Sequence, residues 1–216
     1  MRDLAAFLAD AARGVFPPAD GRVHVLARPC ARDAGVIALT GCSLVFAGVE
    51  EAWVRASLPA DDLSAPLNPP FLRALEERTG RKVNNIDLLT AAPALAGPPP
   101  LELTPTADRD HPRVVRALRH RDEVRAWTVP GGTLLLGRGV AGRWEVAVEV
   151  EAGARGTGLG RRLAVAARHL VPGGGPLWAQ IAPGNAASVR AFMAAGFQAV
   201  GAEALLVEHP AAPAVS

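Results

Sequence analysis

Between residues 101 and 207, the pattern of apolar and polar positions changes repeatedly between one typical of strands and one typical of helices. It therefore predicts a mixture of strands and helices. Short apolar or β-branched runs that end at Gly, Pro or charged residues are typical of strands, whereas apolar residues spaced three and four apart indicate helices. Strands are expected at 101–105, 123–129, 133–140, 144–150 and 176–182, with one or two more at 197–207, and helices at 111–121, 161–170 and 185–194. This order predicts an α/β or α+β fold.

The first 98 residues carry a second set of the same signals. A helix is expected within 1–15, strands at 22–27, 35–41, 42–48 and 84–91, and helices at 50–58 and 69–81. The prolines of residues 91–100 exclude a helix or a central strand and stiffen the chain, so we place a domain boundary there. The predicted organisation is an N-terminal α+β region at 1–98, a second domain at 99–209 and a disordered tail at 210–216.

The composition narrows the classes of function. Half of the residues are hydrophobic, which is enough to bury a core, and the formal net charge is only +2. The sequence has no block of basic residues, so nucleic-acid binding is not expected. It also has no run of about eighteen apolar residues, so a membrane span is not expected. Cys30 and Cys42 are isolated and the histidines are scattered, so neither a disulfide framework nor a metal site is expected. A cytoplasmic protein fits these features best.

A glycine-dense, arginine-led segment at 155–160 lies between the strand expected at 144–150 and the next helix. Glycines at such a junction let the backbone approach a ligand closely, and the free N–H groups of a helix start favour an anion such as phosphate. The dinucleotide fingerprint would need a third glycine where Arg161 or Leu163 stands, and the P-loop would need a lysine in place of Leu159. Both of these phosphate motifs are therefore excluded. A glycine-rich turn between a strand and a helix is also an ordinary structural feature.

The spacing Arg-x-x-Gly-x-Gly, formed by Arg155, Gly158 and Gly160, resembles the pyrophosphate loop of the GNAT superfamily of N-acetyltransferases. In that family the loop follows the fourth strand, and its amides bind the pyrophosphate of acetyl-coenzyme A together with the start of the next helix. The predicted order of strand, loop and helix agrees with this context.

A second segment resembles the other coenzyme motif of the family, Asn-x-x-(Ala/Ser)-x-x-x-(Tyr/Phe)-x-x-x-Gly-Phe. The matching residues are Asn185, Ser188, Phe192, Gly196 and Phe197. The same residues also fit a helix that Asn185 caps and Gly196 ends, with Phe197 in the core. Both interpretations can hold together, because in the family this helix lies beside the thiol end of the coenzyme.

The resemblance covers roughly residues 101–207. It implies a mixed, mostly antiparallel sheet flanked by helices, acetyl-CoA as the co-substrate, and direct transfer of the acetyl group to an amine of a small molecule or a protein. The N-terminal half would then supply the acceptor side, and it could be a degenerate copy of the same fold; a homodimer is also possible. The coenzyme-binding residues implied by the resemblance are Val148, Val150, Arg155, Gly156, Thr157, Gly158, Leu159, Gly160, Arg161, Asn185, Ser188 and Phe192.

The catalytic groups implied by the resemblance are a base, an oxyanion donor and an acid. Strand alternation puts Glu145 and Glu149 on one face of the strand at 144–150, although a bulge expected there by resemblance would switch faces. We expect Glu145 first and Glu149 second as the base, and two carboxylates on a solvated strand face are the ordinary alternative. The oxyanion donor would be a main-chain amide at 148–150.

Phe192 stands where the family usually has a tyrosine as the acid, and the chain has no tyrosine. Either solvent protonates the leaving thiolate, or the chain is a non-catalytic, coenzyme-binding regulatory module. Further candidates for the base, at the start of another predicted strand, are His120, Asp122 and Glu123.

Overall fold

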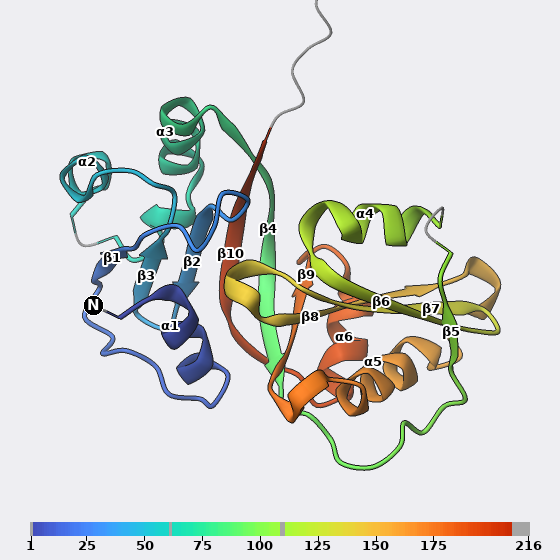
Figure 1. Ribbon diagram of the computed structural model, residues 1–216. Coiled ribbons are helices and arrows are strands. Elements are labelled where there is room, and N and C mark those ends of the chain that lie inside the picture. The colour runs from blue at the N-terminus through green and yellow to red at the C-terminus, as the bar shows by residue number, and fades with distance from the viewer. Residues whose placement is uncertain (1, 61, 109–110, 209–216) are drawn as a thin grey trace, which may run out of the picture. The chain divides into compact units, whose positions relative to one another are not determined.

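The computed structural model describes residues 2–60, 62–108 and 111–208, in which six α-helices and ten strands are present (Figure 1). The predicted tail at 210–216 lies outside the described residues. The contacts divide the chain into two units: unit 1 falls within residues 1–7, 16–87 and 201–216, and unit 2 within 8–15 and 88–200. The predicted domain division at residues 98 and 99 stays a prediction.

Unit 1 is a small α+β unit whose sheet has the strand order β1-β3-β2-β10. Its elements are β1 (Val23–Val25), β2 (Gly35–Leu39), β3 (Cys42–Val45), α2 (Glu51–Ser57) and α3 (Pro69–Thr79), with α1 (Leu4–Ala11), β4 (Arg81–Ala92) and β10 (Gln198–Glu208) crossing the unit boundaries. The apolar face of α3, with Phe71 and Leu75, packs against Val36, Val45 and Leu206 of the sheet. Gly80 ends α3 in a left-handed conformation, as the sequence predicts.

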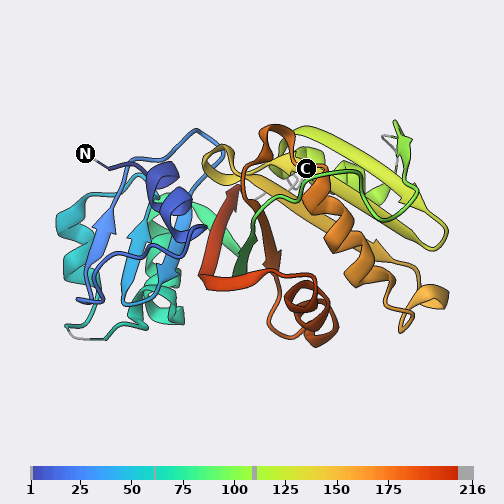
Figure 2. The same ribbon diagram turned by 90° about the horizontal axis from the view of Figure 1, so that it is seen from below.

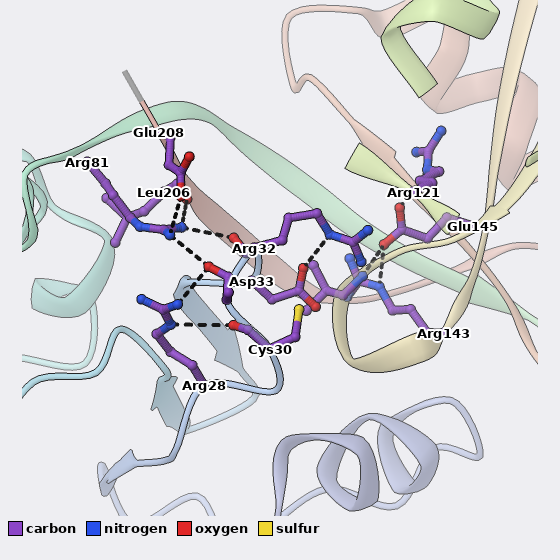
Figure 3. A network of polar contacts seen from close by, with 12 residues as sticks. Arg28, Cys30, Arg32, Asp33, Arg81, Arg121, Arg143, Glu145, Leu206 and Glu208 are labelled. Atoms are coloured by element: carbon purple, nitrogen blue, oxygen red, sulfur yellow. Dashed lines mark hydrogen bonds and ion pairs between the residues drawn. The ribbon is translucent and has the colours of Figure 1, made fainter. Parts of the chain in front are cut away.

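The buried guanidinium of Arg81 joins the segment before β2 to the end of β10 (Figure 3). It donates to the carbonyl oxygens of Ala31 at 2.7 Å and Arg32 at 2.9 Å, and to Leu206 O at 3.3 Å and Glu208 Oε1 at 3.1 Å. Arg81 thereby satisfies loop carbonyls that the sheet leaves unpaired.

Unit 2 holds the strand order β4-β9-β8-β7-β6-β5, in which β8 and β9 form the parallel pair and the other pairs are antiparallel. Its strands are β5 (Thr104–Thr106), β6 (Asp122–Val129), β7 (Gly132–Arg138), β8 (Trp144–Val150) and β9 (Leu177–Ile181), and its helices are α4 (Pro112–His120), α5 (Leu159–His169) and α6 (Ala186–Ala194). The predicted fold class, a mixed and mostly antiparallel sheet flanked by helices, is confirmed.

The two faces of the unit 2 sheet carry different helices (Figures 1 and 2). Helix α4 covers one face, where Val114 and Ala117 contact Leu135 of β7. Helices α5 and α6 cover the other face, where Leu163 and Phe192 join the larger core. Alternate residues of each strand therefore point to α4 and to α5, as the period of two predicts.

The predicted elements differ from the observed ones mainly at their ends. Strand β4 continues to Ala92 because its last five residues pair with β9, and Pro93 follows directly. Strand β5 begins at Thr104 instead of residue 101, since Leu101 and Leu103 pack against the core beside α5. Pairing and packing with distant segments decided both ends, and the local sequence does not encode them. None of the described helices is long and apolar enough to cross a membrane.

Candidate functional site

Strands β8 and β9 pair only at their beginnings. Among the described residues, the matched positions are Trp144 with Leu177 and Glu145 with Trp178. Residues 146–150 of β8 keep their register with β7, whereas β9 pairs with β4 on its other side. No described residue of β8 after Glu145 is matched with a residue of β9, so the end of β8 is unpaired on the side that faces β9.

The register of β8 shows which main-chain groups face that unpaired edge. Gly139 N donates to Arg143 O and Glu151 N donates to Gly131 O, both at 2.9 Å, so the odd-numbered residues bond to β7. Opposed residues of an antiparallel pair alternate between bonded and non-bonded positions. The amides of Val148 and Val150, which the resemblance implies as oxyanion donors, consequently point to the β9 side.

The bulge expected in β8 is absent. Positions 144–150 match 138–132 of β7 one to one, and the register shift of this sheet region lies in β6, between Asp122 and Arg125. The amides of Val148 and Val150 are therefore left without a strand partner because the pairing with β9 ends, and no bulge in β8 is needed. The side chains of Glu145 and Glu149 stay on the α4 face.

The glycine loop lies at the surface and leads directly into α5. Arg155, Gly156, Thr157 and Gly158 are exposed. Gly156 and Gly158 have φ angles of 77° and 78°, a left-handed conformation that favours glycine. Gly158 is the N-cap residue of α5 and no side chain caps the helix. The first N–H groups of α5 are thus left for an anion, with the positive end of the helix dipole behind them.

The space around the loop suits a close ligand. A Cβ atom added at Gly158 would meet no heavy atom within 4 Å, and one added at Gly160 would meet only Val150 at 3.6 Å and Ala191 at 3.8 Å. Arg161 and its neighbour Arg162 are exposed in the first turn of α5. The loop, the end of β8 and helix α6 therefore come together at the start of α5.

The turn between β6 and β7 packs against the residues that precede the glycine loop, a contact that the sequence does not predict. Gly131 has a φ of 79°, and a Cβ atom there would lie 2.6 Å from Ala154 Cβ. Its carbonyl accepts from Glu151 N, and Thr157 Oγ1 donates to Ala154 O at 2.8 Å. The sequence reveals only a Pro-Gly-Gly turn; no local signal shows that it packs under the loop.

The second motif forms the start and the buried side of α6. Asn185 Oδ1 accepts from Ser188 N at 3.1 Å, so these two residues form the N-cap that the sequence predicts. Phe192 is buried, and its ring meets that of Phe197 edge to face at a centroid distance of 5.0 Å. Gly196 ends the helix with a φ of 87°. The structural interpretation of this segment is therefore confirmed, and its coenzyme contacts stay a prediction.

Glu145 lies at the centre of a buried polar cluster (Figure 3). Its carboxylate accepts from Arg121 Nε and Arg143 Nε, both at 2.8 Å, from Gln180 Nε2 at 3.2 Å and from Val140 N at 3.3 Å. Burial raises the pKa of Glu145, but the two guanidinium groups outweigh burial and hold this pKa below its ordinary value. A buried carboxylate that favours its ionised form and has two cationic partners is a poor proton acceptor.

Glu149 has a more open environment on the same face of β8. Its side chain is 39% exposed, and its Oε2 accepts from Arg113 Nε of α4 at 2.8 Å. The other candidates for the base lie elsewhere: Asp122 and Glu123 begin β6, where Glu123 pairs with Arg138, and His120 ends α4. Of the carboxylates predicted as candidates for the base, Glu149 alone is exposed to solvent and lies on the part of β8 that does not pair with β9. The described residues contain no group of three or more His, Cys, Asp or Glu that could hold a metal ion.

Comparisons with known proteins give structural neighbours only. Neither a protein-family model nor a curated protein matches the chain. The structure is similar to a GCN5-related N-acetyltransferase from Kribbella flavida, with 18% identity, a TM-score of 0.43 and coverage of 65% of each chain. It is also similar to an acetyltransferase of the GNAT family from Colwellia psychrerythraea, with 10% identity, a TM-score of 0.43 and 81% of each chain covered. A third similar structure, a GCN5-related N-acetyltransferase from Sphaerobacter thermophilus, has 17% identity and a TM-score of 0.39 over 71% of this chain and 59% of that one.

Proposed function

We propose that the chain is an acetyl-CoA-dependent N-acetyltransferase of the GNAT type, which transfers the acetyl group directly to the amine of a small molecule or a protein. One observation carries this proposal. An exposed, left-handed glycine loop opens an uncapped helix immediately after a strand whose main-chain amides are unpaired on one side. This arrangement offers one site for a diphosphate and, beside it, donors for a polarised carbonyl.

The coenzyme site would use three groups of residues. The diphosphate would lie on the loop amides and the first turn of α5, with the guanidinium groups of Arg155 and Arg161 balancing its charge. The thioester arm would lie along the unpaired edge of β8 and accept from the amides of Val148 and Val150. Its thiol end would reach the side of α6 that carries Asn185, Ser188 and Phe192.

The acetyl thioester supplies an electrophilic carbonyl carbon. The neutral amine attacks this carbon, and the C–S bond then breaks as the thiolate leaves. We assign the removal of the amine proton to Glu149, directly or through water, because its carboxylate is open to solvent on the parted part of β8. Glu145, the other candidate for the base, is held in the buried cluster, so we place it second. The amide of Val148 or Val150 would stabilise the oxyanion, and solvent would protonate the thiolate, since Phe192 has no ionisable proton.

Phe192 also favours a second candidate function. Its ring is buried against Phe197 and offers no acid, which fits a module that binds the coenzyme without rapid transfer. Calorimetry with acetyl-CoA tests coenzyme binding, and thiol release over a panel of amines tests transfer. Binding together with amine-dependent thiol release supports the enzyme; binding with no release from any amine supports the module; no binding contradicts both.

The proposed partners are acetyl-CoA and an amine, without nucleic acid or membrane. A reducing cytoplasm is the proposed setting, and the described residues include two free cysteines, Cys30 and Cys42. The homodimer and the role of residues 1–98 on the acceptor side stay predictions.

A further inference from the structure

An exposed pair of opposite charges lies on the α4 face of unit 2. Arg113 Nε donates to Glu149 Oε2 at 2.8 Å, and the two side chains are 44% and 39% exposed. Within the described residues, neither of these two side chains makes another polar contact. The terminal nitrogens of Arg113 and the Oε1 atom of Glu149 therefore remain available, one set for an anion and the other for a cation.

The pair lies where an acceptor would have to approach. Glu149 stands between Val148 and Val150, whose amides face the unpaired edge of β8. Its side chain points to the α4 face, whereas α5 and its core lie on the other face of the sheet. A coenzyme that lies on the start of α5 and an amine that contacts Glu149 would consequently reach β8 from opposite faces.

Helix α4 adds positive charge around this pair. Arg113, Arg116 and Arg119 repeat every three residues, all are exposed, and the first turn of α4 contains no acid. A cation in the first turn opposes the helix dipole, so Arg113 is unfavourable for the helix itself. Within the described residues Arg116 and Arg119 form no ion pair, and Arg113 is the member of the set beside a carboxylate of β8.

We propose that the acceptor is a zwitterion of the α-amino acid type, whose amino group contacts Glu149 and whose carboxylate contacts Arg113. The inference rests on the proposed function, and it names the substrate class of the same site. Binding would exchange one ion pair for two, and each charge of the protein would keep a partner of opposite sign. A guanidinium can hold a carboxylate through two parallel N–H groups, which fixes the direction of the amine as well as its position.

Matched acceptors and matched variants test this proposal. Thiol release from acetyl-CoA is measured with each common α-amino acid and with its α-carboxamide, which keeps the amine and removes the negative charge. We expect the acids to be preferred by about tenfold or more in kcat/KM, mainly through KM. The Arg113→Gln variant should lower kcat/KM for the acids by about tenfold and leave the amides within about twofold, so that the preference disappears.

Arg116→Gln is the matched control, because it removes one positive charge three residues along the same helix. It should keep the ratio between acids and amides, whereas Glu149→Gln should lower turnover of both. The proposal is overturned if the amides are as good as the acids, if Arg113→Gln lowers both equally, or if only amines without a carboxylate react. Coenzyme binding with no turnover of any amine would contradict the enzymatic function itself, and with it this inference.

Discussion

The side-chain amide of Gln180 on β9 donates to Oε1 of Glu145, the last residue of β8 that pairs with β9, at 3.2 Å. Arg121 Nη2 donates to Gln180 Oε1 at the same distance, so the two strands and the end of α4 are joined at one point. We infer that Glu145 stabilises the arrangement at the point where β8 and β9 stop pairing and diverge.

Replacing Glu145 by Gln should destabilise the protein by about 3 kcal/mol at pH 7, because the buried guanidinium of Arg143 and the partly buried one of Arg121 lose their counter-charge. The folded-state pKa of Glu145 lies below its ordinary value, so its stabilisation is complete above the unfolded pKa and is lost as the pH falls through the folded one. The difference between wild type and Glu145→Gln should therefore be full at neutral pH and shrink below about pH 4. Urea unfolding of both proteins at pH 7 and below about pH 4 measures this difference in the free energy of unfolding.

The control for this prediction is Glu77→Gln, which removes one partner of an exposed ion pair with Arg73 on α3. It should change the free energy of unfolding by no more than about 0.5 kcal/mol. A Glu145→Gln variant that matches this control at pH 7, or whose deficit grows in acid, would contradict the assignment of Glu145 as an ionised, paired carboxylate.

The sequence predicts the order of the elements and the glycine-rich entrance to α5 well, because both depend on local signals. Gly158 at the entrance of α5 and Asn185 at the cap of α6 are recognisable from residue type and spacing alone. The difference in solvent exposure between Glu145 and Glu149 is not predictable in this way. Alternation puts both on one face, but their exposure depends on Arg121, Arg143 and Gln180, which come from other segments. The support of the loop by Gly131 is likewise a contact between distant segments.

Replacing Gly158 by Asp should abolish detectable binding of acetyl-CoA, because the carboxylate would lie at the amides that we assign to the diphosphate. The backbone strain of a non-glycine residue at a φ of 78° should cost about 1 kcal/mol. Gly80→Asp is a close control: Gly80 has a φ of 70°, an equally open surrounding, and a place at the end of α3. Calorimetry should find wild-type affinity in Gly80→Asp; equal affinity in the two variants would refute the loop assignment.

Replacing Gly131 by Ala should weaken coenzyme binding although this residue contacts no ligand in the proposed site. The new methyl group would meet Ala154 Cβ at 2.6 Å and displace the segment before the loop. Together with the strain of a positive φ, this should cost about 2 kcal/mol of stability. Gly142→Ala has similar strain, with a φ of 74° and open space, and it should leave the affinity unchanged. Chemical denaturation of both variants measures the loss of stability, and calorimetry measures their affinity for acetyl-CoA. Together they distinguish the effect of backbone strain, which both variants share, from displacement of the segment before the loop.

Replacing Gly160 by Glu should change stability and binding in opposite directions. Gly160 is the second residue of α5, its φ is not left-handed, and an added Cβ would make only ordinary contacts. A side chain there improves helix propensity, and a negative charge in the first turn suits the dipole, so the fold should gain roughly 0.5–1 kcal/mol. The same charge should weaken acetyl-CoA binding by roughly a hundredfold or more, because it repels the diphosphate. Gly160→Gln adds nearly the same bulk without the charge and should bind more tightly than Gly160→Glu. Similar affinity in both variants would show that no anion binds at this helix start.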